Sequence, residues 1–332
     1  MSDVRLAIDF DWVRYAAGFA GEKRHILAIH KQSGDEYQFK NRTEFYGRGK
    51  AKNKGWLGEQ NATRTSILTA DEFDILDVQV PEPIENVLFS AKQMTEKVLN
   101  RFDTRDFVGF YGVGDSFRVE RSTVLKYKGN REGSLRPMQI DDITDFLVKK
   151  YKMKPCTGLE ADDWCIIAGQ EENTIVVSAD KDTGGFPVDW YNPTHDDWGV
   201  MNCRCFGKLW LEGEGAKEKI RGIGRKFFYW QVAYGDDVDH YKANAASEVP
   251  WGQKSAYIAM QQAQNDKQAF AILVDIFKNL YPEPVEVIGW RGNTITVDWL
   301  YMLKEQFDMA RMWRSETDEV NVEDILRKFS LI

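Results

Sequence analysis

Acidic residues that could hold divalent cations fall into four short groups, widely separated along the chain. The groups are Asp9 at the end of an apolar run, Glu160 with Asp162 and Asp163, Asp180 with Asp182, and Asp236 with Asp239. Carboxylates that gather at one place repel one another unless cations neutralise them. A basic and aromatic patch at residues 127–131 (YKGNR) suits a substrate that carries phosphate. These residue types predict a Mg²⁺-dependent enzyme that acts on phosphodiesters.

Apolar runs of the length of buried strands precede several of these acids. The runs are residues 5–9, 107–113 and 174–178, and they lead to Asp9, Asp115 and Asp180. Helical patterns alternate with them at residues 83–102, 137–151 and 159–171. Strands and helices in alternation predict an α/β fold with a mostly parallel sheet. Such a sheet carries its site at the carboxyl ends of its strands, where these three acids fall.

The chain is expected to have two parts. Residues 1–205 would form the sheet-based core, and residues 206–332 a helical subdomain. Helical patterns in the second part run over residues 225–234, 252–263, 267–281 and 297–314. The core would carry an insertion over about residues 20–80, with a hairpin at 25–46. The Gly-, Lys- and Asn-rich residues 47–65 are predicted to form a basic loop.

Composition limits the class of protein. The 332 residues are 43% hydrophobic and 29% charged, which is typical of a globular chain with a sizeable core. The net charge of −8 is unusual for a nucleic-acid binder, but basic residues cluster at 48–54, 149–154 and 217–226. No run approaches the roughly 18 apolar residues of a membrane span, and no signal peptide is visible. The four cysteines lack disulfide spacing, which favours reduced thiols and a cytoplasmic protein.

Each acidic group, taken alone, also has an ordinary structural explanation. Acids at 160–163 suit the first turn of any helix, Asp180 and Asp182 suit a solvated turn, and Asp236 and Asp239 suit a capping pair. The YKGNR patch alone is typical of an exposed surface. Their occurrence together, in this order, favours the metal-dependent interpretation.

The order IDFDW, YKGNR, EADD, SADKD and GDxxD resembles the 5′-exonuclease and flap endonuclease family, which includes phage exonucleases and the nuclease domain of bacterial DNA polymerase I. The resemblance covers residues 5–265. It implies a PIN-like sheet-based nuclease core whose carboxylates bind two divalent ions, Mg²⁺ with Mn²⁺ as a substitute. The implied ligands of one ion are Asp9, Asp115, Glu160, Asp162 and Asp180. Those of the second are Asp163, Asp182, Asp236 and Asp239.

The resemblance also implies how DNA is held. Lys128 and Arg131 match the basic pair that binds and polarises the scissile phosphate. Tyr127 would stack on the terminal base. Residues 250–256 (PWGQKSA) resemble half of a helix–three-turn–helix, in which Gly252, Lys254 and Ser255 would offer backbone N–H groups to a duplex phosphate.

The implied activity is hydrolysis of DNA from 5′ ends or at 5′ flaps, with removal of primer RNA from hybrids as an additional activity. A phage protein that acts in the host bacterial cytoplasm is expected. The chain departs from the family pattern at His240, where asparagine is usual, and around Gly252, which alone remains of a glycine-rich run. The second departure leaves a potassium site in doubt.

Three other interpretations remain open. Residues 9–13 also fit the motif of haloacid-dehalogenase-like phosphatases, in which Asp9 would be the nucleophile and Asp11 the acid–base group. Such a phosphatase has no use for EADD or YKGNR. A PIN-type ribonuclease would share the sheet but lack the helical part. A non-catalytic DNA-binding scaffold would have lost ligand acids, whereas all nine are present.

Overall fold

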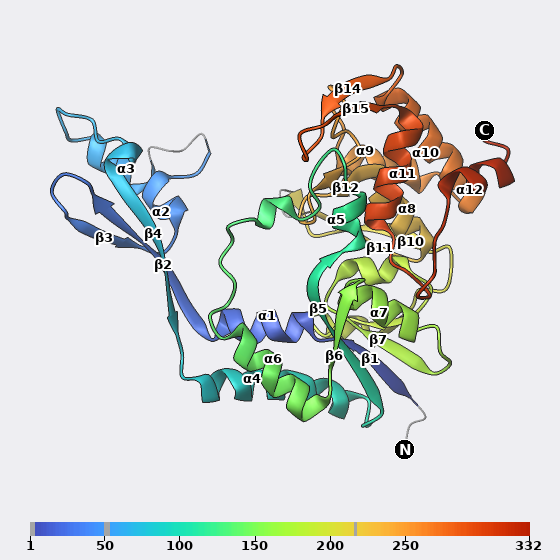
Figure 1. Cartoon of the computed structure of the whole chain (residues 1–332), viewed down its shortest axis with the longest axis horizontal. Coiled ribbons are helices and arrows are strands. Elements are labelled where there is room, and N and C mark those ends of the chain that lie inside the picture. The colour runs from blue at the N-terminus through green and yellow to red at the C-terminus, as the bar shows by residue number, and fades with distance from the viewer. Residues whose placement is uncertain (1–3, 50–53, 216–217) are drawn as a thin grey trace. The chain divides into compact units, whose positions relative to one another are not determined.

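The computed structural model describes residues 4–49, 54–215 and 218–332. Contacts divide the chain into two compact units (Figure 1). Unit 1 comprises Met1–Val13, Thr95–Leu135 and Val148–Ile332, and unit 2 comprises Arg14–Met94 and Arg136–Leu147. Three helices have residues in both units, namely α1 (Asp11–Ala20), α4 (Ile84–Arg101) and α6 (Ile140–Tyr151). Each unit has a sheet of its own.

Unit 1 is built on a six-stranded sheet with the order β6-β5-β1-β7-β8-β9. The strands are β1 (Arg5–Asp9), β5 (Phe107–Ser116), β6 (Lys154–Gly158), β7 (Thr174–Val177), β8 (Asp189–Tyr191) and β9 (Val200–Asn202). All neighbours pair in parallel except β8 and β9. The helix α7 (Ala161–Ala168) packs against β1, β5 and β7. The predicted α/β fold with a mostly parallel sheet is therefore confirmed.

The strand β1 lies at the centre of this sheet, because its residues are apolar enough to be covered on both faces. Leu6, Ala7 and Ile8 are fully buried, as expected for a central parallel strand. In the register, Asp9 pairs with Phe110 of β5, and Ile8 pairs with Val177 of β7. The carboxyl ends of β1 and β7 consequently lie side by side. Strand β5 continues to Ser116, beyond this edge, and its pairing with β6 shifts register between Gly112 and Ser116.

Helices dominate the rest of unit 1, as predicted. They are α8 (Arg225–Tyr234), α9 (Gln253–Gln261), α10 (Asp266–Leu280), α11 (Trp299–Ala310) and α12 (Val322–Lys328), with α5 (Phe117–Arg121) earlier in the chain. Helix α8 is buried along nearly its whole length and packs against α9, α10 and α11. Residues on both sides of the predicted boundary at 205 belong to unit 1, and that boundary stays a prediction.

Short elements connect these helices with the sheet. They are the 3₁₀ helices η3 (Gly129–Arg131), η4 (Lys181–Gly185) and η5 (Asp196–Trp198), and the strand pairs β10 (Lys208–Glu212) with β11 (Lys219–Ile223), β12 (Gly235–Asp236) with β13 (Tyr241–Lys242), and β14 (Val285–Ile288) with β15 (Thr294–Val297). No helix in the described ranges combines the length and apolarity that a bilayer crossing requires.

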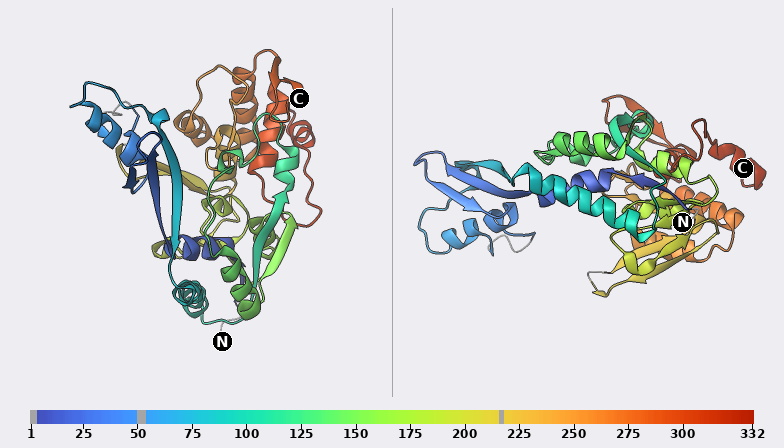
Figure 2. Two further views of the ribbon diagram at one scale, coloured as in Figure 1. Left: turned by 60° about the vertical axis from the view of Figure 1, so that its left-hand side comes forward. Right: turned by 90° about the horizontal axis from the view of Figure 1, so that it is seen from below.

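Unit 2 contains a three-stranded antiparallel sheet with the order β3-β2-β4. Its strands are β2 (Glu22–His30), β3 (Glu36–Phe39) and β4 (Phe73–Pro81), and its short helices are α2 (Arg42–Tyr46), α3 (Trp56–Asn61) and η2 (Ala70–Glu72). The predicted hairpin is confirmed as β2 and β3. Figure 2 shows β2 and the unpredicted strand β4 side by side. Phe39, Phe45 and Phe73 form the centre of a small separate core.

The predicted loop over residues 47–65 is wrong for residues 56–61, which form helix α3. The helix places a large apolar side chain, Trp56, partly buried against the small core of unit 2. The ring of Trp56 packs on the rings of Tyr37 and Phe45, with centroid distances of 4.7 and 5.7 Å. The predicted basic run at 48–54 includes residues 50–53, which lie outside the described residues, as does residue 217 of the run at 217–226.

Candidate metal centre

Asp9 is a nearly buried carboxylate at the carboxyl end of β1, with 7% of the residue exposed. Its Oδ1 accepts a hydrogen bond from the backbone N–H of Asp11 (2.9 Å), and its Oδ2 accepts one from the Ser178 hydroxyl (3.2 Å). Burial raises its pKa to about 8, and the charges of Asp11 and Asp180 add to this effect. A nearby cation would therefore be needed to keep Asp9 fully ionised at neutral pH.

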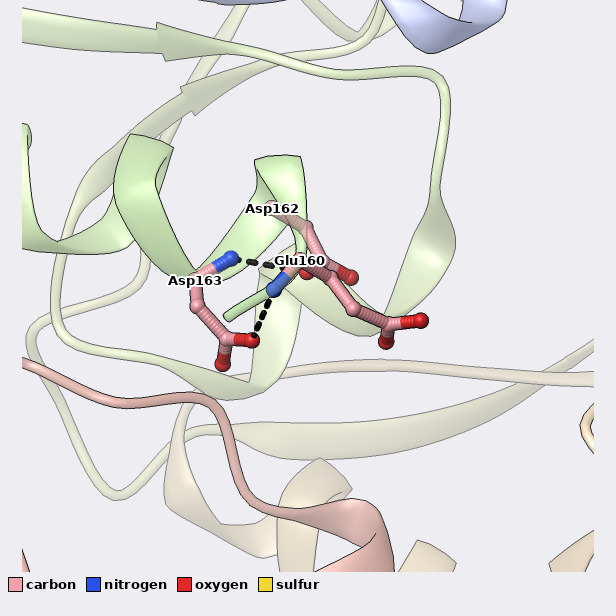
Figure 3. A group of neighbouring side chains, drawn as sticks. All are labelled: Glu160, Asp162 and Asp163. Carbon is pink, nitrogen blue, oxygen red and sulfur yellow. Dashed lines mark hydrogen bonds between the residues drawn. The ribbon is translucent and has the colours of Figure 1, made fainter. Parts of the chain in front are cut away.

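Glu160, Asp162 and Asp163 lie at the start of α7, where Glu160 is the N-terminal capping residue (Figure 3). One oxygen atom of each carboxylate lies within 4.8 Å of the others. Asp162 Oδ1 accepts a hydrogen bond from the backbone N–H of Asp163 (2.7 Å). Burial, followed by the charges of Asp163 and Glu160, raises the pKa of Asp162 well above its usual value. Asp162 is thus a second carboxylate that a cation would stabilise.

Asp163 differs from its neighbours because its side chain is fully buried and already paired. Both oxygens accept from the Arg118 guanidinium, at 2.8 and 2.9 Å. The backbone N–H groups of Glu160 and Trp313 each donate a further hydrogen bond at 3.0 Å. This pairing does not support the predicted ligand role of Asp163. Binding an ion there would break a buried ion pair, which is strongly unfavourable.

Asp180 and Asp182 lie where β7 leads into η4. Asp180 Oδ1 accepts from the backbone N–H of Asp182 (2.9 Å), which fixes the turn between them. Burial raises the pKa of Asp182 to about 7, with contributions from the charges of Asp180 and Asp236, although Lys181 opposes the shift. The Lys181 ammonium lies 2.7 Å from Asp182 Oδ1 and 2.7 Å from Asp236 Oδ2. Lys181 was not predicted as a site residue; its position between two acids of SADKD is the signal that could have identified it.

Asp236 and Asp239 lie in a tight turn after α8 and not in a helix. Asp236 Oδ1 accepts from the backbone N–H groups of Val238 (2.6 Å) and Asp239 (3.3 Å). His240 follows with φ of 60°, a left-handed conformation that asparagine and histidine adopt more readily than most residues.

The YKGNR segment connects two of the acidic groups. The Lys128 ammonium donates to Glu160 Oε1 (2.5 Å), and Arg131 donates to Asp239 Oδ1 (2.5 Å). The Tyr127 hydroxyl lies 3.0 Å from Glu160 Oε2 and 2.8 Å from Asp239 Oδ2, and donates its single proton to one of them at a time. Charge partners, with Lys128 first, hold the pKa of Glu160 below its usual value despite burial.

The stacking role predicted for Tyr127 does not fit this arrangement. The residue is only 3% exposed, and its ring lies within the main core beside the ring of Tyr241. A base cannot stack on a ring that side chains already cover. The sequence pattern could not reveal this, because an aromatic residue beside basic residues is compatible with burial as well as with exposure.

Four other predicted site residues lie apart from these contacts, namely Asp115, Gly252, Lys254 and Ser255. Asp115 is exposed on the extension of β5, and within the described parts of the chain its carboxylate has no hydrogen bond or ion pair. Gly252 caps α9, while Lys254 pairs with Glu218 (2.7 Å) and Ser255 is exposed. Among the residues that the structure describes, no hydrogen bond or ion pair joins any of these four to the acidic groups.

Side-chain contacts bring acids of separate segments together, since the Tyr127 hydroxyl lies near both Glu160 and Asp239 and the Lys181 ammonium lies near both Asp182 and Asp236. Burial raises the pKa of Asp9, of Asp182 and of Asp239, and the charge of Asp180 adds to each shift. The ligand atoms on offer are carboxylate oxygens, which suit hard cations such as Mg²⁺ and Mn²⁺. The nearby thiols are poor ligands, since burial raises the pKa of Cys165 well above its usual value and that of Cys156 to about 12. The donor set fits a divalent metal centre.

Comparisons with known proteins give matches in structure only. No protein-family model matches the chain, and no curated protein matches its sequence. The chain is similar in structure to a zinc-bound 5′-exonuclease of bacteriophage T5, with 16% identity over 74% of this chain and 89% of that chain and a TM-score of 0.39. It is also similar to a T5 flap endonuclease in a complex with DNA and metal ions, with 17% identity over 74% and 88% and a TM-score of 0.38. The function proposed below rests on the acidic residues and their contacts.

Proposed function

We propose that this protein is a Mg²⁺-dependent nuclease that hydrolyses phosphodiester bonds of DNA from 5′ ends or at 5′ flaps. The observation that carries the proposal is the gathering of carboxylates from distant segments around Asp180, with basic side chains between them. Neither a solvated turn nor a helix cap requires acids from separate segments to share one tyrosine hydroxyl or one lysine ammonium, as Glu160 with Asp239 and Asp182 with Asp236 do. Cleavage of RNA in RNA–DNA hybrids belongs to the same proposal.

The proposed ligands form two groups. Asp9, Asp162 and Asp180, with Glu160 beside them, would hold one ion, and Asp182, Asp236 and Asp239 would hold a second. Asp163 is left out because Arg118 occupies both of its oxygens. Asp115 is left out because it is exposed on the extension of β5. Divalent ions supply Lewis-acid stabilisation of the phosphate and make a water molecule more acidic.

Lys128 and Arg131 would bind the scissile phosphate. In the structure each is paired with a carboxylate of the centre, so each lies within one side-chain length of a phosphate held there. A cation on Glu160 or Asp239 would weaken these ion pairs and leave N–H groups for phosphate oxygens. Arg131 is the more accessible of the two, with 49% of its side chain exposed against 30% for Lys128. Tyr127 would position Glu160 and Asp239 through its hydroxyl.

Cleavage of labelled DNA tests the proposal. Blunt duplex, 5′-flap and RNA–DNA hybrid substrates, labelled at either end, would be incubated with wild type, Asp162→Asn and Asp11→Asn, with Mg²⁺ or with EDTA. We expect metal-dependent cleavage that Asp162→Asn reduces by about 100-fold or more and that Asp11→Asn retains. The two labels report polarity.

The phosphatase interpretation gives the opposite pattern. It predicts no cleavage of any DNA substrate and a phosphomonoesterase activity that disappears in Asp11→Asn. Asp11 Oδ2 accepts a hydrogen bond from the backbone N–H of Gly112 (3.0 Å), so both variants need a check of folding by circular dichroism. Intact DNA after incubation with folded, metal-replete wild type would overturn the nuclease proposal.

A further inference from the structure

The Lys181 ammonium lies between two carboxylates of the second proposed ligand group. It lies 2.7 Å from one oxygen of Asp182 and 2.7 Å from one oxygen of Asp236. The two aspartates come from η4 and from the turn after α8, and they are only 9% and 8% exposed. The lysine therefore pairs with two nearly buried carboxylates from different segments, as a bridging cation would.

An ammonium and a divalent ion cannot occupy the same carboxylate pair. Both are cations, and their mutual repulsion at such short range is large where water is scarce. A divalent ion would have to displace the ammonium from both oxygens before it could bind them. The binding free energy of the ion at this pair is therefore reduced by the free energy of the two ion pairs that it breaks.

In the described parts of the chain, three acids of the other group have no such competitor, although Glu160 beside them pairs with Lys128 and Arg118. Among the residues that the structure describes, Asp9, Asp162 and Asp180 form no ion pair with a lysine or an arginine. Their carboxylates accept hydrogen bonds from backbone N–H groups, and Asp9 also accepts one from a serine hydroxyl. An ion can bind to them without displacing a side-chain cation. Binding an ion therefore requires displacement of a lysine at Asp182 and Asp236, but of no side-chain cation at Asp9, Asp162 and Asp180.

We propose that Lys181 competes with the second divalent ion for Asp182 and Asp236, so that the protein without nucleic acid binds one ion tightly and a second ion weakly. This inference rests on the proposed function, because it assumes that the acidic groups bind divalent ions. It assigns Lys181 the role of setting the occupancy of the second group. The second ion binds fully only when the lysine side chain leaves the pair.

Titration of the metal-free protein with Mn²⁺, in the absence of nucleic acid, tests this role. Calorimetry gives the number and affinity of the ions bound, and the electron paramagnetic resonance signal of free Mn²⁺ counts them independently. For wild type we expect one tight and one weak ion. In Lys181→Met, which keeps the length of the side chain and removes its charge, the second ion should bind at least about tenfold more tightly. In Lys181→Arg, which keeps the charge, it should stay weak.

Lys242→Met is the matched control. Lys242 pairs with Asp237 at 2.9 Å, next to Asp236 in sequence, but on an exposed surface. The control loses the same charge and should bind both ions as wild type does. Thermal melting of each variant shows whether it is folded, and a misfolded Lys181→Met leaves Lys181→Gln as the second neutral variant.

Two results would overturn the inference. One is a wild type that binds two ions with affinities equal to those of the folded neutral variant. The other is a Lys242→Met variant that strengthens the second ion as much as Lys181→Met does, since charge alone would then explain the effect. Failure of the proposed function looks different, because wild type and every variant would then bind no Mn²⁺ at all.

Discussion

Asp9 and Asp182 are the carboxylates whose burial has the clearest consequence for stability. Their pKa values rise from 3.8 to about 8 and about 7. Between the ordinary and the raised pKa, the folded metal-free protein holds protons that the unfolded chain has released. Unfolding then releases protons, so the free energy of unfolding falls as the pH rises through this window and levels off above about pH 8. A divalent ion bound to these carboxylates would offset this loss of stability.

The melting temperature of the metal-free protein is therefore expected to be lower at about pH 8.5 than at about pH 6. Mg²⁺ should raise the melting temperature more at the higher pH, because ionised carboxylates bind it. The asparagine side chain in Asp9→Asn has nearly the same shape as aspartate and does not titrate. The melting temperature of this variant should therefore fall less as the pH rises. Calorimetric melting of both proteins checks this, and an equal fall in wild type and Asp9→Asn would contradict the role given to Asp9.

The sequence predicted the positions of these acids better than their partners. Asp9 ends one apolar run and Asp180 follows another. Such runs predict parallel strands, and the carboxyl ends of parallel strands meet at one edge of the sheet. Lys181 and Tyr127 depend on side-chain contacts with residues far along the chain. No periodicity of the sequence specifies such contacts, so the ammonium between Asp182 and Asp236 and the hydroxyl near Glu160 could only be found in the structure.

At the scale of elements, one buried arginine joins α5, α7 and the chain after α11. Arg118 is 2% exposed and pairs with Asp163, while its guanidinium also donates to the carbonyl oxygens of Met309 (3.1 Å) and Arg311 (2.7 Å). Its fourth partner is Glu160 Oε2, at 2.9 Å. The start of α7, and with it the carboxylate of Glu160, is thus held by a residue outside the acidic groups.

Arg118→Met is expected to lower the free energy of unfolding by about 3–5 kcal/mol, because it leaves Asp163 buried without its partner. Arg121→Met is the control from the same helix. Arg121 pairs with Asp308 and Glu319 at the surface, so its loss should cost about 1 kcal/mol or less. Denaturant unfolding measures both. Similar losses of unfolding free energy in the two variants would show that the buried ion pair contributes no more to stability than the pairs of Arg121.

Elements were predicted well where apolar spacing is regular. Helices α4, α8 and α10 lie within two residues of the predicted patterns, because each has an apolar face that the core covers. Helix α3 was missed because glycine, lysine and asparagine surround Trp56 and Leu57, whose packing against the core of unit 2 is not visible in the sequence. Strand β4 was missed because its residues are largely exposed, so the alternation of apolar and polar side chains is weak.

At the scale of the whole molecule, two separate cores imply two regions of separate stability. The core of unit 2 is small and aromatic, and Phe45 lies fully buried at its centre. Phe45→Ala should lower the stability of unit 2 by about 3–5 kcal/mol, since it removes a large buried ring. Hydrogen exchange should then become faster in β2, β3 and β4 and stay unchanged in β1 and β7.

Phe89→Ala provides the control for that experiment. Phe89 also belongs to unit 2 but is 59% exposed, so its truncation removes little packing. Its exchange rates should match those of wild type. Faster exchange in β1 and β7 of Phe45→Ala, to the same extent as in unit 2, would show that the two units unfold together.

Two adjacent aspartates allow a sharp test of the proposed metal centre. Asp236 is nearly buried and faces Lys181, whereas Asp237 pairs with Tyr234 and Lys242 on the exposed side of the same turn. Cleavage of a 5′-flap substrate by Asp236→Asn and Asp237→Asn should be measured in Mg²⁺ under single-turnover conditions. The metal-centre account predicts a loss of about 100-fold or more for Asp236→Asn and a change within about twofold for Asp237→Asn. Equal rates in the two variants would contradict it.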